Sequence, residues 1–234
     1  MKNDKTPKLQ LIYFTLRALA EPPQMMMRFA NIKYTYEMAA DFYGKPWSEV
    51  KDSIPFGQLP MLVVNNEHCI WQSGAIVRYL SKITNTYPSD PILEAKVDAV
   101  FESTQELFFP LNPTVNVFVG ERHKELKETF LKSFPNSLNY FSKMIEKNQV
   151  GCFFFGELPF YCDFSAYHHF SLALKLQRDI LDDFPLIKRF MKAFEELPSI
   201  RAYLDERPEL LDIGIAPKMK INNDIVNTAS DRIS

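Results

Sequence analysis

The spacing of apolar residues changes near residue 90, and this change restricts the folds open to the chain. Before it, short runs of strand-forming residues alternate with helix-length segments. Strands are predicted at 9–13, 34–38, 61–64 and 68–71, and helices at 20–30 and 73–83. Asn65-Asn66-Glu67 separates the last two strands as a hairpin turn. The order strand, helix, strand, hairpin, helix indicates an α/β unit.

After residue 91 the strand pattern stops and helical periodicity replaces it. Helices are predicted at 92–109, at 121–148 with an interruption or kink at Pro135, and at 163–177, 186–197 and 199–207. We therefore predict two domains, an α/β domain at 9–87 and an all-helical domain at 92–214. Residues 215–234 are rich in Asn, Asp and Lys and show no periodicity, so we expect a mobile tail there.

The composition argues against several classes of function. Seven glycines are scattered along the chain, so neither common phosphate-binding glycine motif can be assembled. Lys and Arg number 27 and Asp and Glu 29, and the net charge of −2 argues against binding nucleic acid or an anionic membrane. Three cysteines without a Cys-x-x-Cys pair argue against a disulfide scaffold. A polar N-terminus and the lack of an apolar run of about 18 residues predict a cytoplasmic protein without a membrane span.

A metal site is also not expected. His168 and His169 are adjacent, so on a helix they point about 100° apart and cannot share a metal without further ligands. We predict exposed or capping side chains for both histidines.

The segment from Ile54 to Leu62, Ile-Pro-Phe-Gly-Gln-Leu-Pro-Met-Leu, carries chemical information. Pro60 precedes a strand and removes a ladder donor. It fits an ordinary strand-entry turn, and it also fits a cis-proline that leaves the backbone of Leu59 free to pair with an extended peptide. Gln72-Ser73 stands at a strand-to-helix junction, where a helix N-terminus favours a carboxylate. Capping of that helix by Ser73 is the alternative, and the two roles are compatible.

Taken together, the ordered motifs of the first half resemble the glutathione-binding domain of a cytosolic glutathione transferase. The resemblance is greatest to the sigma class, which includes the haematopoietic type of prostaglandin D synthase. The motifs are Tyr13-Phe14-x-x-Arg17-x-x-Ala20-Glu21, Trp47, Lys51, Pro55-Phe56-Gly57-Gln58-Leu59-Pro60 and Gln72-Ser73-x-Ala75-Ile76-x-Arg78-Tyr79-Leu80. The resemblance covers residues 9–84 strongly, and the helical half by length and layout. It implies a thioredoxin-like domain that holds glutathione as co-substrate, a helical-bundle domain that completes an apolar pocket, no covalently bound cofactor, and a homodimer.

The resemblance also implies roles for individual residues. Tyr13 matches the tyrosine that stabilises the glutathione thiolate. The residues matched to binding of the tripeptide are Trp47, Lys51, Gln58, Leu59, Pro60, Gln72 and Ser73, with Glu106 reaching across to the glutathione of a neighbouring subunit. The residues matched to the apolar pocket for a hydrophobic electrophile are Phe14, Leu16, Leu19, Phe108 and Phe109.

The function implied is conjugation of the glutathione thiolate to hydrophobic electrophiles. Two alternatives stay open: a glutathione-dependent isomerase acting on a prostaglandin endoperoxide, and a non-catalytic binder like the lens crystallins or the ligand-carrying relatives. Leu19 and Gln24 stand where the family commonly has basic residues, and Ala18 stands where it commonly has glycine. These departures predict weaker activation of the thiolate.

Overall fold

A four-stranded mixed sheet organises the first part of the computed structural model, which describes residues 6–228. Its strands are β1 (Leu9–Tyr13), β2 (Tyr34–Met38), β3 (Met61–Val64) and β4 (His68–Trp71), in the order β2-β1-β3-β4. β1 runs parallel to β2 and antiparallel to β3, and β3 runs antiparallel to β4. The two central strands, β1 and β3, carry the most apolar runs and are the most deeply buried.

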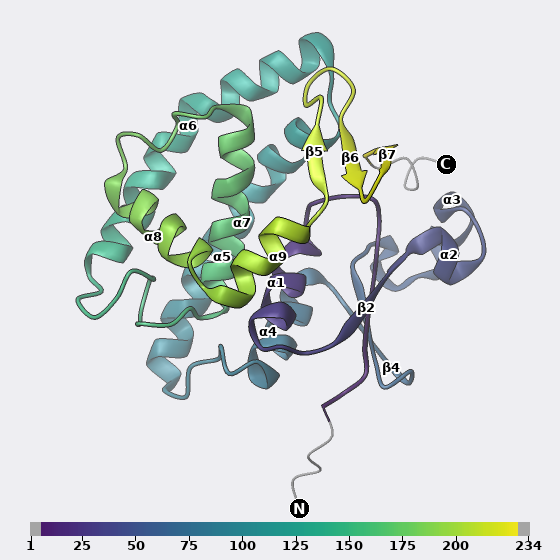
Figure 1. Ribbon diagram of the computed structural model, residues 1–234, viewed down its shortest axis with the longest axis horizontal. Helices are drawn as coiled ribbons and strands as arrows, with labels where there is room; N and C mark the ends of the chain where they lie inside the picture. Colours follow the sequence, from purple (N-terminus) through teal and green to yellow (C-terminus); the bar gives the residue numbers. More distant parts are fainter. Residues whose placement is uncertain (1–5, 229–234) are drawn as a thin grey trace, which may run out of the picture.

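Helices complete the α/β half on one side of this sheet. α1 (Glu21–Phe29) makes the crossover from β1 to β2, and α4 (Ser73–Ile83) follows β4 and packs against α1. The connection from β2 to β3 contains α2 (Ala39–Tyr43), α3 (Trp47–Val50) and two 3₁₀ turns, η1 (Lys51–Ser53) and η2 (Pro55–Gly57). Figure 1 shows α2 and α3 on the side of the sheet away from the helical half. This arrangement agrees with the predicted thioredoxin-like domain.

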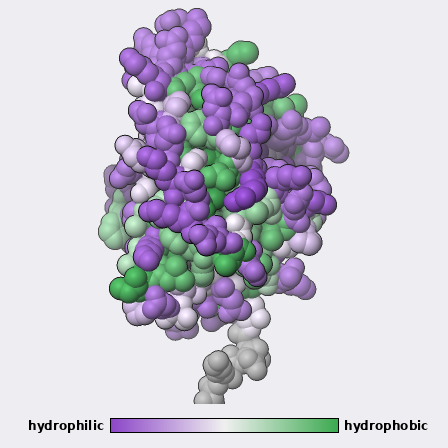
Figure 2. Space-filling model, turned by 90° about the vertical axis from the view of Figure 1, so that its left-hand side faces the viewer, coloured by the Kyte–Doolittle hydropathy of each residue, from purple (hydrophilic) through white to green (hydrophobic). Residues whose placement is uncertain are grey.

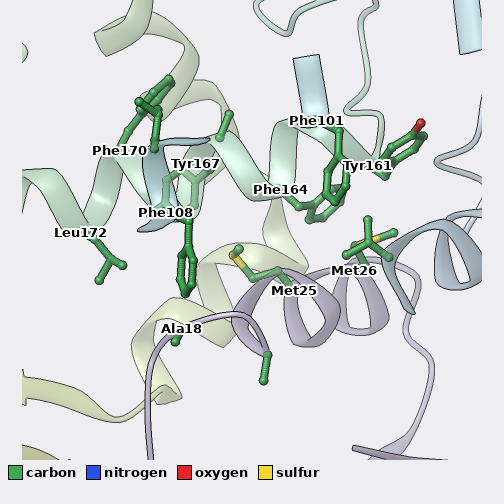
Figure 3. Packing of buried hydrophobic residues seen from close by; sticks show 14 of the residues in the cluster. Ala18, Met25, Met26, Phe101, Phe108, Tyr161, Phe164, Tyr167, Phe170 and Leu172 are labelled. Atoms are coloured by element: carbon green, nitrogen blue, oxygen red, sulfur yellow. The ribbon is translucent and has the colours of Figure 1, made fainter. Parts of the chain in front are cut away.

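The second half is built around one buried helix. The helices are α5 (Pro91–Asn116), α6 (Gly120–Glu146), α7 (Tyr161–Leu176), α8 (Pro185–Glu195) and α9 (Pro198–Glu206). α7 is buried along almost its whole length, and α5 packs along it. In Figure 3, aromatic side chains of α5 and α7 face Met25 and Met26 of α1, so a shared core joins the two halves.

The outer helices are amphipathic, as their position requires. α8 buries Ile187, Phe190, Met191 and Phe194, a spacing that places all four on one helix face. Figure 2 views the molecule from the side that carries α6 and α8, where hydrophilic side chains cover most of the surface and apolar ones appear between them. The apolar face of each outer helix therefore packs against the core, and its other face is exposed to solvent.

A buried carboxylate fixes the N-terminus of α7. The backbone N–H groups of Phe160 and Phe154 donate to the two oxygens of Asp163 at 2.8 and 3.0 Å. The N-cap residue is Phe160, whose side chain cannot accept a hydrogen bond, so Asp163 supplies the side-chain part of the capping interaction alone. Burial raises the pKa of Asp163 to about 7.

The prolines within the long helices do not end them. The sequence predicted a helix end at residue 109 and a kink or interruption at Pro135, yet α5 continues through Pro110 and Pro113 to Asn116, and α6 is assigned as one helix across Pro135. A proline inside a helix costs about 3 kcal/mol. Packing of α5 against α7 and α6 outweighs that cost, because the apolar positions continue beyond the prolines to buried Leu111 and Val115.

Three short strands follow the last helix, where the sequence predicted none. β5 (Glu209–Leu211), β6 (Lys218–Ile221) and β7 (Asp224–Asn227) form an antiparallel sheet in the order β5-β6-β7. The expected all-helical character of 92–214 therefore fails at β5, and the expected tail from residue 215 contains two hydrogen-bonded strands. The missed signal is the Asn222-Asn223 turn, which has a positive φ at Asn222 and joins two alternating segments. Residues 229–234 of that tail lie outside the described residues.

Candidate active site

Tyr13 lies at the carboxyl end of β1, with the ring of Phe14 beside its own. Its side chain is 4% exposed. The ring centroids of Tyr13 and Phe14 are 5.4 Å apart, and Phe14 meets Trp47 edge-on at 5.2 Å. Tyr36, on the neighbouring strand, donates its hydroxyl to the backbone oxygen of Phe14 at 2.7 Å. These contacts hold the turn after β1, and with it Tyr13, in one place.

The turn before β3 contains a cis peptide bond between Leu59 and Pro60, the second of the two possibilities that the sequence left open. Both residues are buried. Pairing of β3 with β1 and β4 begins at Met61, and Ile12 is the partner of Met61 in β1. Because the two strands are antiparallel, the next residue of β1, Tyr13, lies opposite the residue before β3, Pro60. The expected tyrosine and the expected proline turn therefore meet at the same end of the sheet.

The N-terminus of α4 lies beside the same turn. Gln72 takes the N-cap position with a φ of 68°, and Ser73 is the first residue of the helix. The side-chain amide of Gln72 donates to the amide oxygen of Gln58 at 3.1 Å. Two motifs that are 14 residues apart are thus in direct contact.

Trp47 and Lys51 come from the connection between β2 and β3. Trp47 is buried, with Phe14 on one side and Tyr43 6.5 Å away on another. Lys51 is exposed, and its aliphatic carbons lie 3.6 Å from the position that a Cβ atom would take at Gly57. The exposed ammonium group of Lys51 therefore stands beside the turn that leads to Leu59.

The residues predicted for the apolar pocket have different environments. Phe14, Leu16 and Phe108 are buried, Leu19 is half-buried, and Phe109 is 73% exposed. Figure 3 shows Phe108 pointing from α5 toward the loop that carries Ala18. The buried members therefore come from both halves of the chain: Phe14 and Leu16 belong to the loop after Tyr13, and Phe108 of α5 points toward that loop.

Glu106 lies apart from these residues, in a groove between α5 and α6. The groove has a volume of about 450 Å³. Its lining is mostly apolar or uncharged and includes Leu107, Pro110, Phe130, Phe134, Phe141 and Met144. Glu106 is exposed in its wall.

A buried ionic cluster supports the loop after Tyr13, and sequence reasoning missed most of it. Glu21 accepts from Arg207 Nη1 at 3.0 Å and lies 3.9 Å from Arg17 Nε. Arg17 is buried, and desolvation lowers its pKa. Arg207 stands 186 positions from Glu21, so no local pattern could have linked the two. The side-chain oxygen of Gln24 accepts from the Tyr34 hydroxyl at 3.2 Å.

The adjacent histidines of α7 correct one expectation. His168 and His169 are both fully buried rather than exposed or capping. Burial lowers the pKa of both side chains, and brings that of His169 to about 3, so both are neutral at pH 7. Within residues 6–228 no group of three or more His, Cys, Asp or Glu side chains is arranged to hold a metal ion. In the same range, no helix has the length and apolar composition needed to cross a membrane.

Comparisons with known proteins agree with this layout. Residues 9–82 match the family model for the N-terminal domain of glutathione S-transferase, and residues 111–207 match a model for its C-terminal domain. Glutathione S-transferase P of Caenorhabditis elegans is 27% identical over 85% of this chain and 93% of its own. Hematopoietic prostaglandin D synthase of Gallus gallus is 27% identical over 87% of this chain and 98% of its own.

Solved structures give the same result. The glutathione S-transferase from Ascaris lumbricoides superposes with a TM-score of 0.76 at 27% identity, over 87% of this chain and 98% of its own. The Pi-class glutathione S-transferase of Onchocerca volvulus superposes with a TM-score of 0.74 at 26% identity, over 86% and 93% of the two chains.

Proposed function

Since the chain belongs to the glutathione S-transferase family, with both of its domains matched, we propose that it conjugates the glutathione thiolate to a hydrophobic electrophile at the end of the β1–β3 sheet. The observation that carries this proposal is the meeting of Tyr13, the Leu59–Pro60 turn and the N-terminus of α4 at one end of the sheet. A tyrosine hydroxyl, the backbone of Leu59 ahead of the paired part of β3, and a helix N-terminus are groups suited to a thiol-bearing acidic peptide.

Tyr13 acts as the donor to the thiolate. A free thiol has a pKa near 8.5, so only a few per cent is ionised at neutral pH. Lowering that pKa by about two units requires about 2.7 kcal/mol of preferential stabilisation of the thiolate. One hydrogen bond to a charged acceptor contributes about 1.5–3 kcal/mol. The hydroxyl of Tyr13 can therefore supply most of the effect while it stays protonated.

The remaining residues hold the tripeptide along its length. The N-terminus of α4, with Ser73 as its first residue and Gln72 before it, receives the γ-glutamyl carboxylate through N–H groups and the helix dipole. The backbone of Leu59 pairs with the cysteinyl unit, and Gln58 positions Gln72 through their hydrogen bond. Trp47 and Lys51 take the glycine end, where the ammonium group of Lys51 faces a carboxylate. Phe14, Leu16, Leu19, Phe108 and Phe109 line the side that receives the electrophile.

We also propose a homodimer that uses the groove between α5 and α6. The groove exposes Pro110 and Tyr140, and carries Glu106 in its wall. In a two-fold dimer the groove of each copy would pack against the partner, and the role proposed for Glu106 requires the partner's glutathione to lie beside that interface. Light scattering should give twice the 27.2 kDa of one chain, and a monomeric mass at micromolar concentration would contradict the dimer. Glu106→Gln should weaken glutathione binding without changing that mass.

We retain two finer assignments as part of this proposal. We propose that the chain is most like the sigma class, and the motifs from Tyr13 to Glu21 and from Gln72 to Leu80 support this proposal. We propose a cytoplasmic location, and the three cysteines, all of them free thiols, support this proposal.

The reaction is tested with a chlorodinitrobenzene substrate. Tyr13→Phe removes one hydroxyl and should lower kcat/KM by about ten- to a hundredfold, the equivalent of about 1.5–3 kcal/mol. Glutathione affinity measured by calorimetry should change little. Tyr79→Phe, a half-buried tyrosine on α4, is the matched control and should keep full activity.

Two results would contradict the proposal at different points. A native protein that binds glutathione but gives no turnover above the uncatalysed rate is a binder and not an enzyme. A Tyr13→Phe variant with unchanged kcat/KM would leave the transferase activity in place and remove Tyr13 from the mechanism.

A further inference from the structure

The last described segment, residues 208–228, lies beyond the part of the chain that matches the family. The model for the C-terminal domain ends at residue 207, and β5, β6 and β7 all follow it. We call residues 208–228 the C-terminal cover. In Figure 1 the three strands lie across the adjoining ends of α5 and α6, and the loop after β1 runs past the lower ends of β5 and β6.

The sheet of the C-terminal cover has one apolar face and one polar face. Leu210 pairs with Met219, and Met219 pairs with Val226, so these three side chains form a row across the strands on one face. Leu210 and Met219 are buried, and Val226 packs against the core. The opposite face carries exposed residues such as Lys220 and Ile225. The apolar face is therefore turned toward the body of the protein.

Polar contacts join the cover to the loop that follows Tyr13. Arg17 Nη1 in that loop donates to the carbonyl oxygen of Pro208 at 3.5 Å, where the cover begins. The side-chain amide of Asn116, at the end of α5, donates to the carbonyl oxygen of Arg17 at 3.4 Å. At the other end of the cover, the hydroxyl of Thr228 donates to the carbonyl oxygen of Asn116. The cover is thus bonded directly to the loop after Tyr13 at its first residue, and indirectly, through Asn116, at its last.

A third attachment lies in the middle of the cover, at Gly214. The backbone N–H of Gly120 donates to the carbonyl oxygen of Gly214 at 2.9 Å. Gly214 has a φ of +79°, and a Cβ atom there would lie 2.5 Å from Cδ2 of His123. The ring of His123 is itself fixed by a 2.8 Å hydrogen bond to the carbonyl oxygen of Thr114. Only glycine allows the cover to approach α6 this closely.

The loop beneath is buried to a degree unusual for a loop. Phe14 and Leu16 are about as buried as core residues, and Ala18 is 0% exposed. From these observations we propose that the C-terminal cover forms the outer wall of the electrophile site and limits the size of the second substrate that the enzyme accepts. This inference rests on the proposed function, because it takes the loop after Tyr13 as one side of that site. An apolar wall fits compact hydrophobic electrophiles and disfavours bulky or charged ones.

S-alkyl glutathiones of increasing chain length test the cover directly, because they occupy both the glutathione site and the space that an electrophile would fill. Three variants loosen the cover to different degrees: a chain that ends at Arg207, Gly214→Ala and Thr228→Val. Ile225→Ala, on the exposed face, is the control. By calorimetry, the loosened variants should bind S-hexylglutathione roughly tenfold more tightly relative to S-methylglutathione than the native protein does.

Hydrogen exchange supplies a second readout that needs no ligand. The amides of residues 14–20 should exchange faster in Thr228→Val and Gly214→Ala than in the native protein and in Ile225→Ala. This measurement keeps the test valid if the chain that ends at Arg207 fails to fold.

The possible failures are distinguishable. If the native protein binds neither glutathione nor S-methylglutathione, the proposed function fails. If it binds both, and the ratio of the two S-alkyl affinities stays the same in every variant that folds, the cover does not limit the second substrate. Unchanged exchange at residues 14–20 would likewise overturn the proposal.

Discussion

The α/β half and the helical half place their unusual features in opposite environments. In the α/β half, the positive φ angles of Phe56 and Gln72 occur at exposed turns around the candidate site. In the helical half the backbone of α7 is regular, and the unusual features are polar side chains buried on it: Asp163, His168 and His169. The exposed turns can present backbone groups to a ligand, whereas the buried polar side chains of α7 affect the stability of the core. Substitutions in the two halves should therefore separate activity from stability.

Asp163→Ala should have the largest effect and should act on stability alone. It removes the acceptor of two backbone N–H groups, the buried one of Phe154 and the part-buried one of Phe160, at about 1–3 kcal/mol each. We expect the free energy of unfolding in urea to fall by about 4 kcal/mol. Asp182→Ala is the control, because Asp182 is exposed and pairs only with Lys188, so it should change stability by less than about 1 kcal/mol.

The separation of activity from stability would fail if Asp163→Ala lost affinity for glutathione as well as unfolding free energy. Under conditions in which Asp163→Ala is folded, its affinity for glutathione should stay within about twofold of the native value, a difference smaller than the usual effect of one lost hydrogen bond. A large loss of affinity in the folded variant would show that α7 positions the site as well as the core.

The buried His169 of α7 should make the stability of the protein depend on acid. Burial lowers the pKa of His169 from 6.5 to about 3. Between these values the unfolded chain binds a proton that the folded protein does not bind. The stability contributed by neutral His169 is therefore complete above pH 6.5 and is lost as the pH falls, by about 1.4 kcal/mol per pH unit. At pH 4.5 this amounts to about 3 kcal/mol.

The effect of His169 must be measured as a difference, because other groups titrate in the same range. His168 acts in the same direction, since burial also lowers its pKa, whereas Asp163 acts in the opposite direction because its pKa is raised to about 7. We expect the unfolding free energy of the native protein to fall more steeply with acid than that of His169→Gln, which keeps a neutral polar side chain. Parallel profiles between pH 6.5 and 4.5 would contradict a neutral buried His169.

Ser73→Ala should show the opposite behaviour, a loss of binding with little loss of stability. Its hydroxyl stands at the first position of α4, where we place the γ-glutamyl carboxylate. Losing a hydrogen bond to a charged group should weaken glutathione binding about tenfold or more. The unfolding free energy should change by less than about 0.5 kcal/mol. Ser199→Ala, on α9 far along the chain, is the control for a serine lost outside the site, and should bind glutathione normally.

The sequence predicted the parts of the structure that depend on short-range pattern. The four strands of the first sheet have the predicted bounds, because each is a short apolar run between turn-forming residues. The contact of Gln72 with Gln58 and the packing of Phe14 on Trp47 were not predictable, since both depend on how separate segments meet. The continuation of α5 past Pro110 likewise depends on tertiary packing, which local propensity does not include.

The buried histidines and the C-terminal cover were missed for related reasons. Whether His168 and His169 face solvent depends on which helices cover α7, and their spacing alone cannot show it. In β6, Lys218-Met219-Lys220-Ile221 alternates over only four residues, too few to stand out from a polar tail. The short strands gain their apolar face only when Leu210, Met219 and Val226 are brought into one row.

Asn222→Ala should have the smallest effect, and it sharpens the comparison between the two kinds of unusual feature. Asn222 has a φ of 55° in the turn between β6 and β7, a conformation that asparagine tolerates better than alanine. We expect Asn222→Ala to lower the unfolding free energy by about 1 kcal/mol and Asn222→Gly to restore it. Asn223→Ala, in the same turn but without a positive φ, is the matched control. Because this turn has a positive φ yet lies outside the proposed glutathione site, the affinity for glutathione should be the same in all three variants. If Asn222→Ala instead weakens glutathione binding, the turn of the C-terminal cover belongs to the glutathione site. Positive φ angles that serve the site would then not be confined to the α/β half.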